Sequence, residues 1–67
     1  MATIKSIGEK IAQARLHRGM TQEELANEAD IDRSYISDIE NGKTNTTIAM
    51  ILAICTVLEV NPKNLFD

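Results

Sequence analysis

The residues that can begin and end helices restrict the possible folds of this chain most, and they are most clearly recognised between residues 20 and 42. The hydroxyl of Thr21 can accept from the backbone N–H of Glu24, whose carboxylate can accept in return from the N–H of Thr21. Met20 and Leu25 flank this capping box at the spacing of a hydrophobic staple. The sequence therefore predicts that a short helix begins after Thr21.

A second short helix is predicted to follow almost at once. The first helix is expected to end near Asp30, and Asp32 can cap the next one. Ile36 and Ile39 lie three residues apart, so they can face the same side, and Gly42 can adopt the left-handed conformation that ends a helix. Two short helices with a tight connection and apolar positions only on their facing sides are typical of a helix-turn-helix.

The rest of the chain adds helices and no strands. Apolar residues at helical spacing predict a helix over about residues 7–18, and a further helix over about 47–58 follows a polar loop. Asn61-Pro62 is expected to begin one last helical turn, because proline is favoured at the first helical position. No segment alternates with period two, so we expect a single all-α domain of five helices over residues 1–67, with the helix-turn-helix at about 21–41.

The outward face of the second helix of this pair carries groups able to contact bases. Arg33, near its first turn, can direct two N–H donors at guanine O6 and N7. Tyr35 can pack on a thymine methyl group or donate to a phosphate, and Asp38 can accept from cytosine N4. The alternative is a solvated polar helix face, but the capped pair of helices around it favours DNA. The candidate base-contacting residues are Arg33, Ser34, Tyr35, Ser37 and Asp38.

Candidate phosphate contacts lie on both flanks of this face. Gln22 begins the preceding helix, so its amide would lie beside unpaired backbone N–H groups that attract phosphate. Asn41, Lys43 and Thr44 would meet the DNA backbone on the other flank. Each is individually an ordinary surface residue, and only together do they indicate a surface for double-stranded DNA.

The charge of the chain opposes DNA binding. Its formal net charge is −3, whereas most nucleic-acid-binding proteins are basic. We therefore expect weak non-specific binding, and a DNA-facing surface that concentrates Arg33, Lys43 and Arg18.

The sequence lacks the residues that catalysis, metal binding or membrane insertion would require. His17 is the only histidine, and Cys55, the only cysteine, lies in an apolar run typical of a core. We therefore expect no enzyme activity, no metal, no cofactor and no intrachain disulfide. The N-terminus is too polar for a signal peptide, and the longest apolar run is far shorter than the roughly 20 residues of a membrane span. These features predict a cytoplasmic protein that does not bind membranes.

The segment from Ile48 to Leu58 is apolar on every side and carries Thr56 as its one polar residue. A helix of this kind must be buried on more than one face. We expect Ile48, Ile51, Leu52, Cys55 and Leu58 to fill the core. The remaining apolar side chains predict a homodimer surface within about residues 49–66, made of Ala49, Met50, Ala53, Val57, Leu65 and Phe66. A two-fold dimer would place two recognition helices about 34 Å apart, facing a near-palindromic operator.

Residues 7–66 resemble the Cro and phage-repressor type of helix-turn-helix proteins, also called the XRE family. The resemblance rests on Thr-Gln-x-x-Leu-Ala at 21–26, Ile-x-x-Ile-Glu-x-Gly at 36–42 and Val-Asn-Pro at 60–62. It implies a five-helix lambda-repressor-like fold, with Gln22 on a phosphate and with Arg33, Ser34, Ser37 and Asp38 at the bases. It also implies a salt bridge between Arg15 and Glu40, which spacing alone does not indicate.

Within that family the chain is most similar to the controller proteins of restriction-modification systems. The pointers are Asp-Arg-Ser-Tyr-Ile-Ser at 32–37 and Leu-Glu-Val at 58–60. This similarity implies a dimeric transcriptional regulator that acts on its own operon. The alternative is an antitoxin or protein–protein interaction module with the same fold, for which a toxin or RNA polymerase would be the partner.

Overall fold

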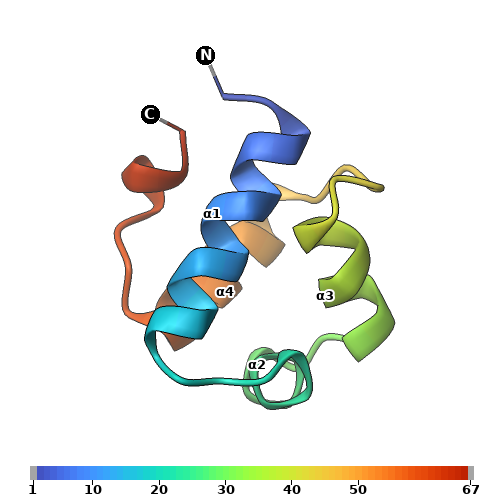
Figure 1. The fold of residues 1–67 in the computed structure, drawn as a ribbon, viewed down its shortest axis with the longest axis vertical. Coiled ribbons are helices and arrows are strands. Elements are labelled where there is room, and N and C mark those ends of the chain that lie inside the picture. The colour runs from blue at the N-terminus through green and yellow to red at the C-terminus, as the bar shows by residue number, and fades with distance from the viewer. Residues whose placement is uncertain (1, 67) are drawn as a thin grey trace.

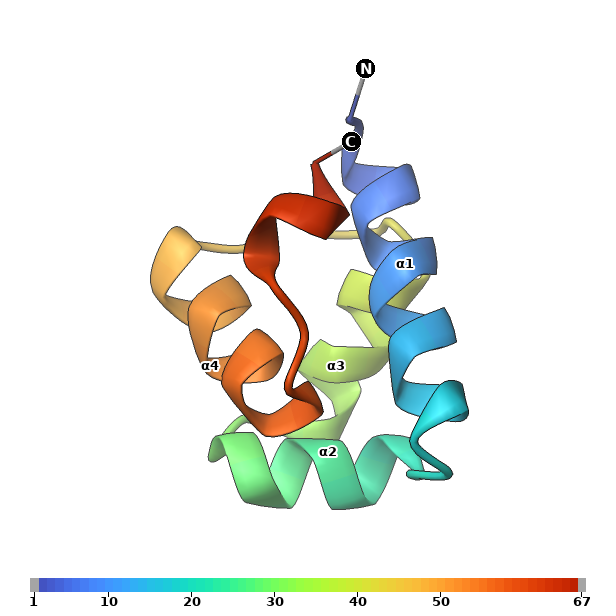
Figure 2. The same ribbon diagram turned by 90° about the vertical axis from the view of Figure 1, so that its left-hand side faces the viewer.

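The computed structural model describes residues 2–66, and within them the chain is entirely helical. Four α-helices, α1 (Ile4–His17), α2 (Gln22–Ala29), α3 (Arg33–Glu40) and α4 (Ile48–Leu58), precede the 3₁₀ helix η1 (Pro62–Leu65) (Figure 1). Figure 2 shows α2 lying across one end of the molecule, beneath α1 and α4. The all-α prediction is confirmed. Between residues 2 and 66 no helix is both long enough and apolar enough to cross a bilayer.

Side-chain caps decide where the helices begin. Thr21 Oγ1 accepts from the Glu24 N–H at 3.0 Å, and Glu24 Oε1 accepts from the Thr21 N–H at 2.9 Å, which confirms the predicted capping box. Thr3 and Ser6 form a second capping box, so α1 begins about one turn earlier than its apolar pattern predicted. Asp32 caps α3 as predicted, its Oδ1 accepting from the N–H of the second helical residue at 3.3 Å.

The prediction of five α-helices is wrong in the last segment. Asn61 caps it and Pro62 opens it, as expected. However, the Asn64 N–H donates to the Asn61 carbonyl at 2.9 Å and the Phe66 N–H donates to the Lys63 carbonyl at 3.1 Å, so both bonds span three residues. A segment this short cannot build a ladder of α-helical bonds, and a 3₁₀ turn satisfies its backbone instead.

The core lies among all four α-helices. Its largest fully buried side chains are Ile11 from α1, Leu25 from α2, Ile36 from α3, and Ile54 and Leu58 from α4. Aliphatic side chains fill this space closely, as expected from a sequence with one tyrosine and one phenylalanine. The core thus fixes how α3 is held against the rest of the molecule.

The structure corrects which face of α4 is covered. Ile48 and Leu52, expected in the core, are 68% and 48% exposed, whereas Ile54 is completely buried. The reason is that a helix with apolar residues on every side carries no periodic signal for its inward face. Cys55 is a core residue as expected, and its burial raises the pKa of its thiol.

Two non-glycine residues among 2–66 have left-handed backbones, and each ends a helix. Asp30 has φ 57° after α2, and Glu59 has φ 56° after α4. Aspartate adopts this conformation more readily than most residues, whereas glutamate gains no such local compensation. The exposed carboxylate of Glu59 pairs with Arg18 at 2.8 Å, an ion pair of a kind that contributes little in water.

Replacing Glu59 with glycine is therefore expected to stabilise the fold. Removing the Cβ relieves about 1 kcal/mol of left-handed strain, which exceeds the contribution of an exposed ion pair. We expect the melting temperature to rise by a few degrees in a thermal melt followed by circular dichroism. Glu59→Gln, which removes the charge but keeps the Cβ, should leave the melting temperature nearly unchanged. A loss of stability in Glu59→Gly would show that the ion pair dominates.

Candidate nucleic-acid interface

A three-residue turn holds α2 and α3 in a fixed relation. Asp30 takes the left-handed conformation, and the Ile31 N–H then donates to the Ala26 carbonyl at 2.9 Å, which closes α2. The side chain of Ile31 packs against the core, and Asp32 caps α3 immediately afterwards. The turn therefore has little freedom, and α3 begins with Arg33 at a defined place beside α2.

The two sides of α3 differ sharply. Ile36 and Ile39 are buried against the other helices. Arg33, Ser34 and Asp38 are exposed, and Ser37 is half-buried. The outward side of this helix therefore carries the polar groups that the sequence predicted as base contacts, with no large apolar side chain among them.

Tyr35 differs from the other candidates on α3. It is half-buried and packs against the core, and its hydroxyl donates to the Asn45 carbonyl at 3.2 Å. The ring therefore links α3 to the loop that leads into α4. A contact from Tyr35 to DNA would use the exposed part of the ring or require the hydroxyl to change partner.

Arg33 and Gln22 come together around one shallow hollow. This hollow lies at the beginning of α2, and Thr21, Gln22 and Arg33 are among its lining residues. The first turn of α2 contributes the positive end of its helix dipole there. One candidate base contact and one candidate phosphate contact thus share a single hollow, which the acidic side chain of Glu23 also lines.

A buried ion pair supports this surface from behind. Arg15 Nε donates to Glu40 Oε2 at 2.7 Å and Arg15 Nη2 donates to Glu40 Oε1 at 3.0 Å, with side chains only 11% and 5% exposed. Arg15 Nη1 also donates to the Met20 carbonyl at 2.7 Å. Hydrogen bonding to the Glu40 carboxylate raises the pKa of Arg15, against the opposite effect of burial. The pair joins α1, the turn before α2 and the last residue of α3.

Gln22 belongs to the same network. Its Nε2 donates to Glu40 Oε1 at 3.0 Å, so one of its two amide N–H bonds is directed inward. The sequence did not indicate this bond, since nothing in the local pattern relates Gln22 to Glu40. A phosphate contact by the Gln22 side chain would use its second N–H.

The loop after α3 carries the remaining candidate phosphate contacts. Asn41 Nδ2 donates to the Ser37 carbonyl at 2.8 Å, and Thr44 Oγ1 donates to the Asn45 carbonyl at 3.2 Å. Lys43 is exposed on the same loop. Asn41 and Thr44 therefore stabilise the end of α3 and its loop, whereas Lys43 extends into solvent.

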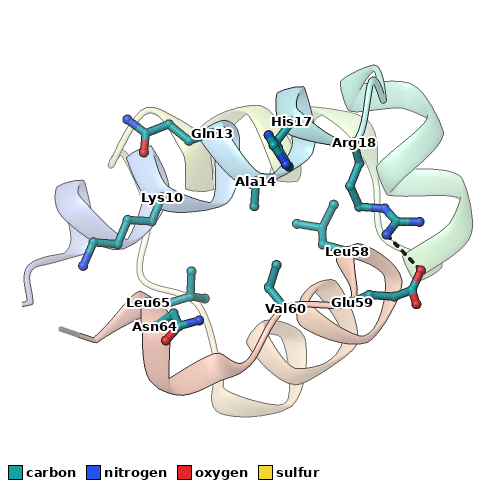
Figure 3. A pocket seen from close by; sticks show the side chains of 10 residues that line it. All are labelled: Lys10, Gln13, Ala14, His17, Arg18, Leu58, Glu59, Val60, Asn64 and Leu65. Carbon is teal, nitrogen blue, oxygen red and sulfur yellow. Dashed lines mark ion pairs between the residues drawn. The ribbon is translucent and has the colours of Figure 1, made fainter.

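Arg18 is not placed with Arg33 and Lys43. It pairs with Glu59 at the edge of a groove whose floor includes Ala14, Leu58 and Val60 (Figure 3). This groove lies between α1 and η1, and η1 lies on the opposite side of α1 from α3 (Figure 1). The expectation that Arg18 adds charge to the DNA-facing surface is corrected accordingly.

Comparison with known proteins decides the family. The protein-family model described as "Helix-turn-helix" matches residues 11–65, which is most of the chain. The chain belongs to the helix-turn-helix family. The family resemblance inferred from the sequence is thereby confirmed.

The relatives of this helix-turn-helix protein include controller proteins. It is 48% identical over 61 residues to Control protein C.BamHI of Bacillus amyloliquefaciens, covering 90% of this chain and 75% of the relative. The restriction-modification controller protein C.AhdI of Aeromonas hydrophila matches with a TM-score of 0.91 at 33% identity, covering 94% and 96% of the two chains. SinR, a master regulator for biofilm formation solved in complex with DNA, matches with a TM-score of 0.85 at 39% identity, covering 91% and 98%.

The helix-turn-helix protein has a second candidate surface, which is apolar. Ile4, Ile48, Leu52 and Phe66 are large exposed hydrophobic residues, and three of them, Ile4, Ile48 and Phe66, line one groove with Ile7 and Ile51. Of the residues predicted for self-association, Ala49 and Phe66 are exposed and Met50, Ala53 and Val57 are half-buried. Leu65 is 3% exposed and belongs to the monomer core, because η1 folds it inward against α1 and α4. Ile48 and Leu52, which the sequence assigned to the core, and Ile4, which it did not single out, are exposed beside these residues.

Proposed function

We propose that this protein is a transcriptional regulator that binds operator DNA as a homodimer through the outward side of α3. The observation that carries the proposal is the division of α3 into a buried apolar side and an exposed polar side that begins with Arg33. A helix held in this way by a short turn can enter the major groove with its first residues toward the bases. Arg33 would recognise guanine, with Ser34, Ser37 and Asp38 as further base contacts.

The relatives support both the DNA-binding role and a narrower one. SinR is known in complex with DNA, C.AhdI is a restriction-modification controller protein, and C.BamHI is a control protein. We therefore propose that this protein regulates a restriction-modification operon, including its own gene, in the bacterial cytoplasm. Cys55 is buried, and among residues 2–66 no group of three His, Cys, Asp or Glu side chains could hold a metal ion.

A homodimer would cover the apolar surface. Ile48 and Leu52 on α4 and Phe66 after η1 expose large hydrophobic side chains, which a second copy of the chain can remove from water. A two-fold axis through this surface would relate two α3 helices, and a spacing of about 34 Å would match successive major grooves on one side of the duplex. The expected operator is therefore nearly palindromic.

Arg33→Ala is expected to weaken binding to the operator by about 10- to 100-fold, since a bidentate arginine–guanine contact contributes about 1–3 kcal/mol of discrimination. The measurement is a gel shift with the duplex immediately upstream of the gene and with a random duplex of equal length. Arg18→Ala is the matched control, because it makes the same charge change on an arginine that pairs with Glu59. Both variants should remain folded at the temperature of the gel shift and keep the mass of the wild-type dimer.

A protein–protein interaction module is the alternative, and the acidity of α2 favours it. Glu23, Glu24 and Glu28 are exposed on α2, and Asp30 follows them. Such a surface would suit a basic protein partner, with a toxin or RNA polymerase as candidates. If wild-type protein binds the upstream duplex no better than the random one, the regulator proposal fails and this alternative takes its place.

A further inference from the structure

Lys5 lies against Gly42, where α1 begins and α3 has just ended. A Cβ atom added to Gly42 would meet the Cα, Cβ and Cγ atoms of Lys5 at 3.0, 3.2 and 3.5 Å. The first carbons of the lysine side chain therefore pass along the backbone of Gly42. Lys43 is the next residue of this loop, and both lysines are exposed. Two cations far apart in the sequence thus flank one glycine.

Apart from Arg33, the other cationic side chains either form ion pairs or lie on another side of the molecule. Arg15 is buried against Glu40, and Arg18 pairs with Glu59. Lys10 lines the groove between α1 and η1, and Lys63 is part of η1, across α1 from α3 (Figures 1 and 3). Neither of the two ion pairs formed within residues 2–66 involves Lys5 or Lys43. The cations available near the α3 surface are therefore Arg33, Lys43 and Lys5.

The position of Lys5 is not explained by helix stability. It lies in the first turn of α1, which contains no acidic residue, and a cation at the positive end of a helix is unfavourable. The negative end of α3, just before Gly42, offsets part of this repulsion. Exposed Glu9 lies one turn further along α1, but neither ion pair within residues 2–66 involves Lys5 or Lys43. An external anion could therefore approach both lysines.

We propose that Lys5 contacts the phosphate backbone of duplex DNA beside Lys43, which extends the phosphate-binding surface from residues 41–44 to the first turn of α1. The inference rests on the proposed DNA-binding function. It adds a contact made by a different segment from those of the helix-turn-helix. Because phosphates carry no base identity, Lys5 contributes to affinity and its salt dependence, while Arg33 contributes to the choice of sequence.

The test compares Lys5→Gln with Lys63→Gln, which makes the same charge change across α1 from α3. Binding of each full-length variant to the fluorescent upstream duplex, and to a random duplex of equal length, is measured over a series of KCl concentrations. Each lysine–phosphate contact removed should reduce the slope of log Kobs against log[KCl] by about 0.9, or about 1.8 for a dimer. Lys63→Gln should retain the wild-type slope, and Lys5→Arg should restore it.

The outcomes separate this inference from the function on which it rests. Equal slopes for Lys5→Gln and Lys63→Gln would overturn the Lys5 contact while leaving sequence-specific binding intact. Equal wild-type affinity for the two duplexes would overturn operator recognition. The effect of Lys5→Gln on the slope of log Kobs against log[KCl] would still be measurable on either duplex. Absence of wild-type binding to both duplexes would overturn both. Circular dichroism melts check that exposed Lys5 can be replaced without unfolding the protein.

Discussion

Replacing Glu40 with alanine is expected to lower the free energy of unfolding by about 3–5 kcal/mol. The carboxylate accepts from Arg15 twice and from Gln22 once, so its removal leaves a buried guanidinium without a counter-charge. A single core in a domain of fewer than about 70–80 residues rarely supplies more than about 3–5 kcal/mol, so this 67-residue variant should be partly unfolded at room temperature. Urea unfolding followed by far-UV circular dichroism at a fixed protein concentration measures the change.

Two comparisons show whether burial is the cause. Arg18→Ala breaks the exposed ion pair with Glu59 and should cost less than about 1 kcal/mol. The double variant Arg15→Met/Glu40→Met removes both buried charges and should recover much of the loss, since apolar replacements of a buried pair are often close to neutral. A loss below 1 kcal/mol in Glu40→Ala would mean that Arg15 finds solvent or another partner.

Gly8→Ala is expected to destabilise the protein by about 2 kcal/mol or more, although alanine is the better helix former. Gly8 is buried on the side of α1 that faces α3, and an added Cβ would overlap the Ile39 carbonyl oxygen and lie 3.0 Å from that of Glu40. Both neighbours are backbone atoms, so α1 and α3 would have to separate. The same shift would disturb the Arg15–Glu40 pair beside it.

Gly19→Ala is the matched control for this close approach. Gly19 has nothing within 4 Å of an added Cβ, but its φ of +70° disfavours any side chain, so alanine should cost about 1 kcal/mol through conformation alone. Thermal melts of both variants, together with the operator gel shift, measure the two effects. If Gly8→Ala is as stable as the wild type, the contact between α1 and α3 can widen without loss.

Local side-chain chemistry made the starts of α2, α3 and η1 predictable. The caps at Thr21, Asp32 and Asn61 form as the sequence predicted, because each depends on a hydroxyl, carboxylate or amide reaching an N–H two or three residues away. The polar outward side of α3 was predictable for a similar reason, since Ile36 and Ile39 identify the buried side. Its role in base contact remains a prediction.

Local patterns failed wherever the decisive partner lies far along the chain or the pattern is uniform. The apolar segment of α4 did not reveal that Ile54 faces the core while Ile48 and Leu52 face solvent. Pro62 indicated a last helical turn, but not that three-residue bonds would make this turn a 3₁₀ helix. The Arg15–Glu40 pair was expected only through family resemblance.

The sequence by itself therefore determined the all-α class, the helix-turn-helix at about residues 21–41 and the polar character of α3. These follow from caps and helical periodicity, which act over a few residues. Only the tertiary structure decided that Gln22 shares Glu40 with Arg15, that Lys5 lies on Gly42, and that Arg18 is on another side. These relations depend on how closely α1 approaches α3 and on which side of α4 is covered. Packing of the whole core sets both, and no short stretch of sequence contains that information.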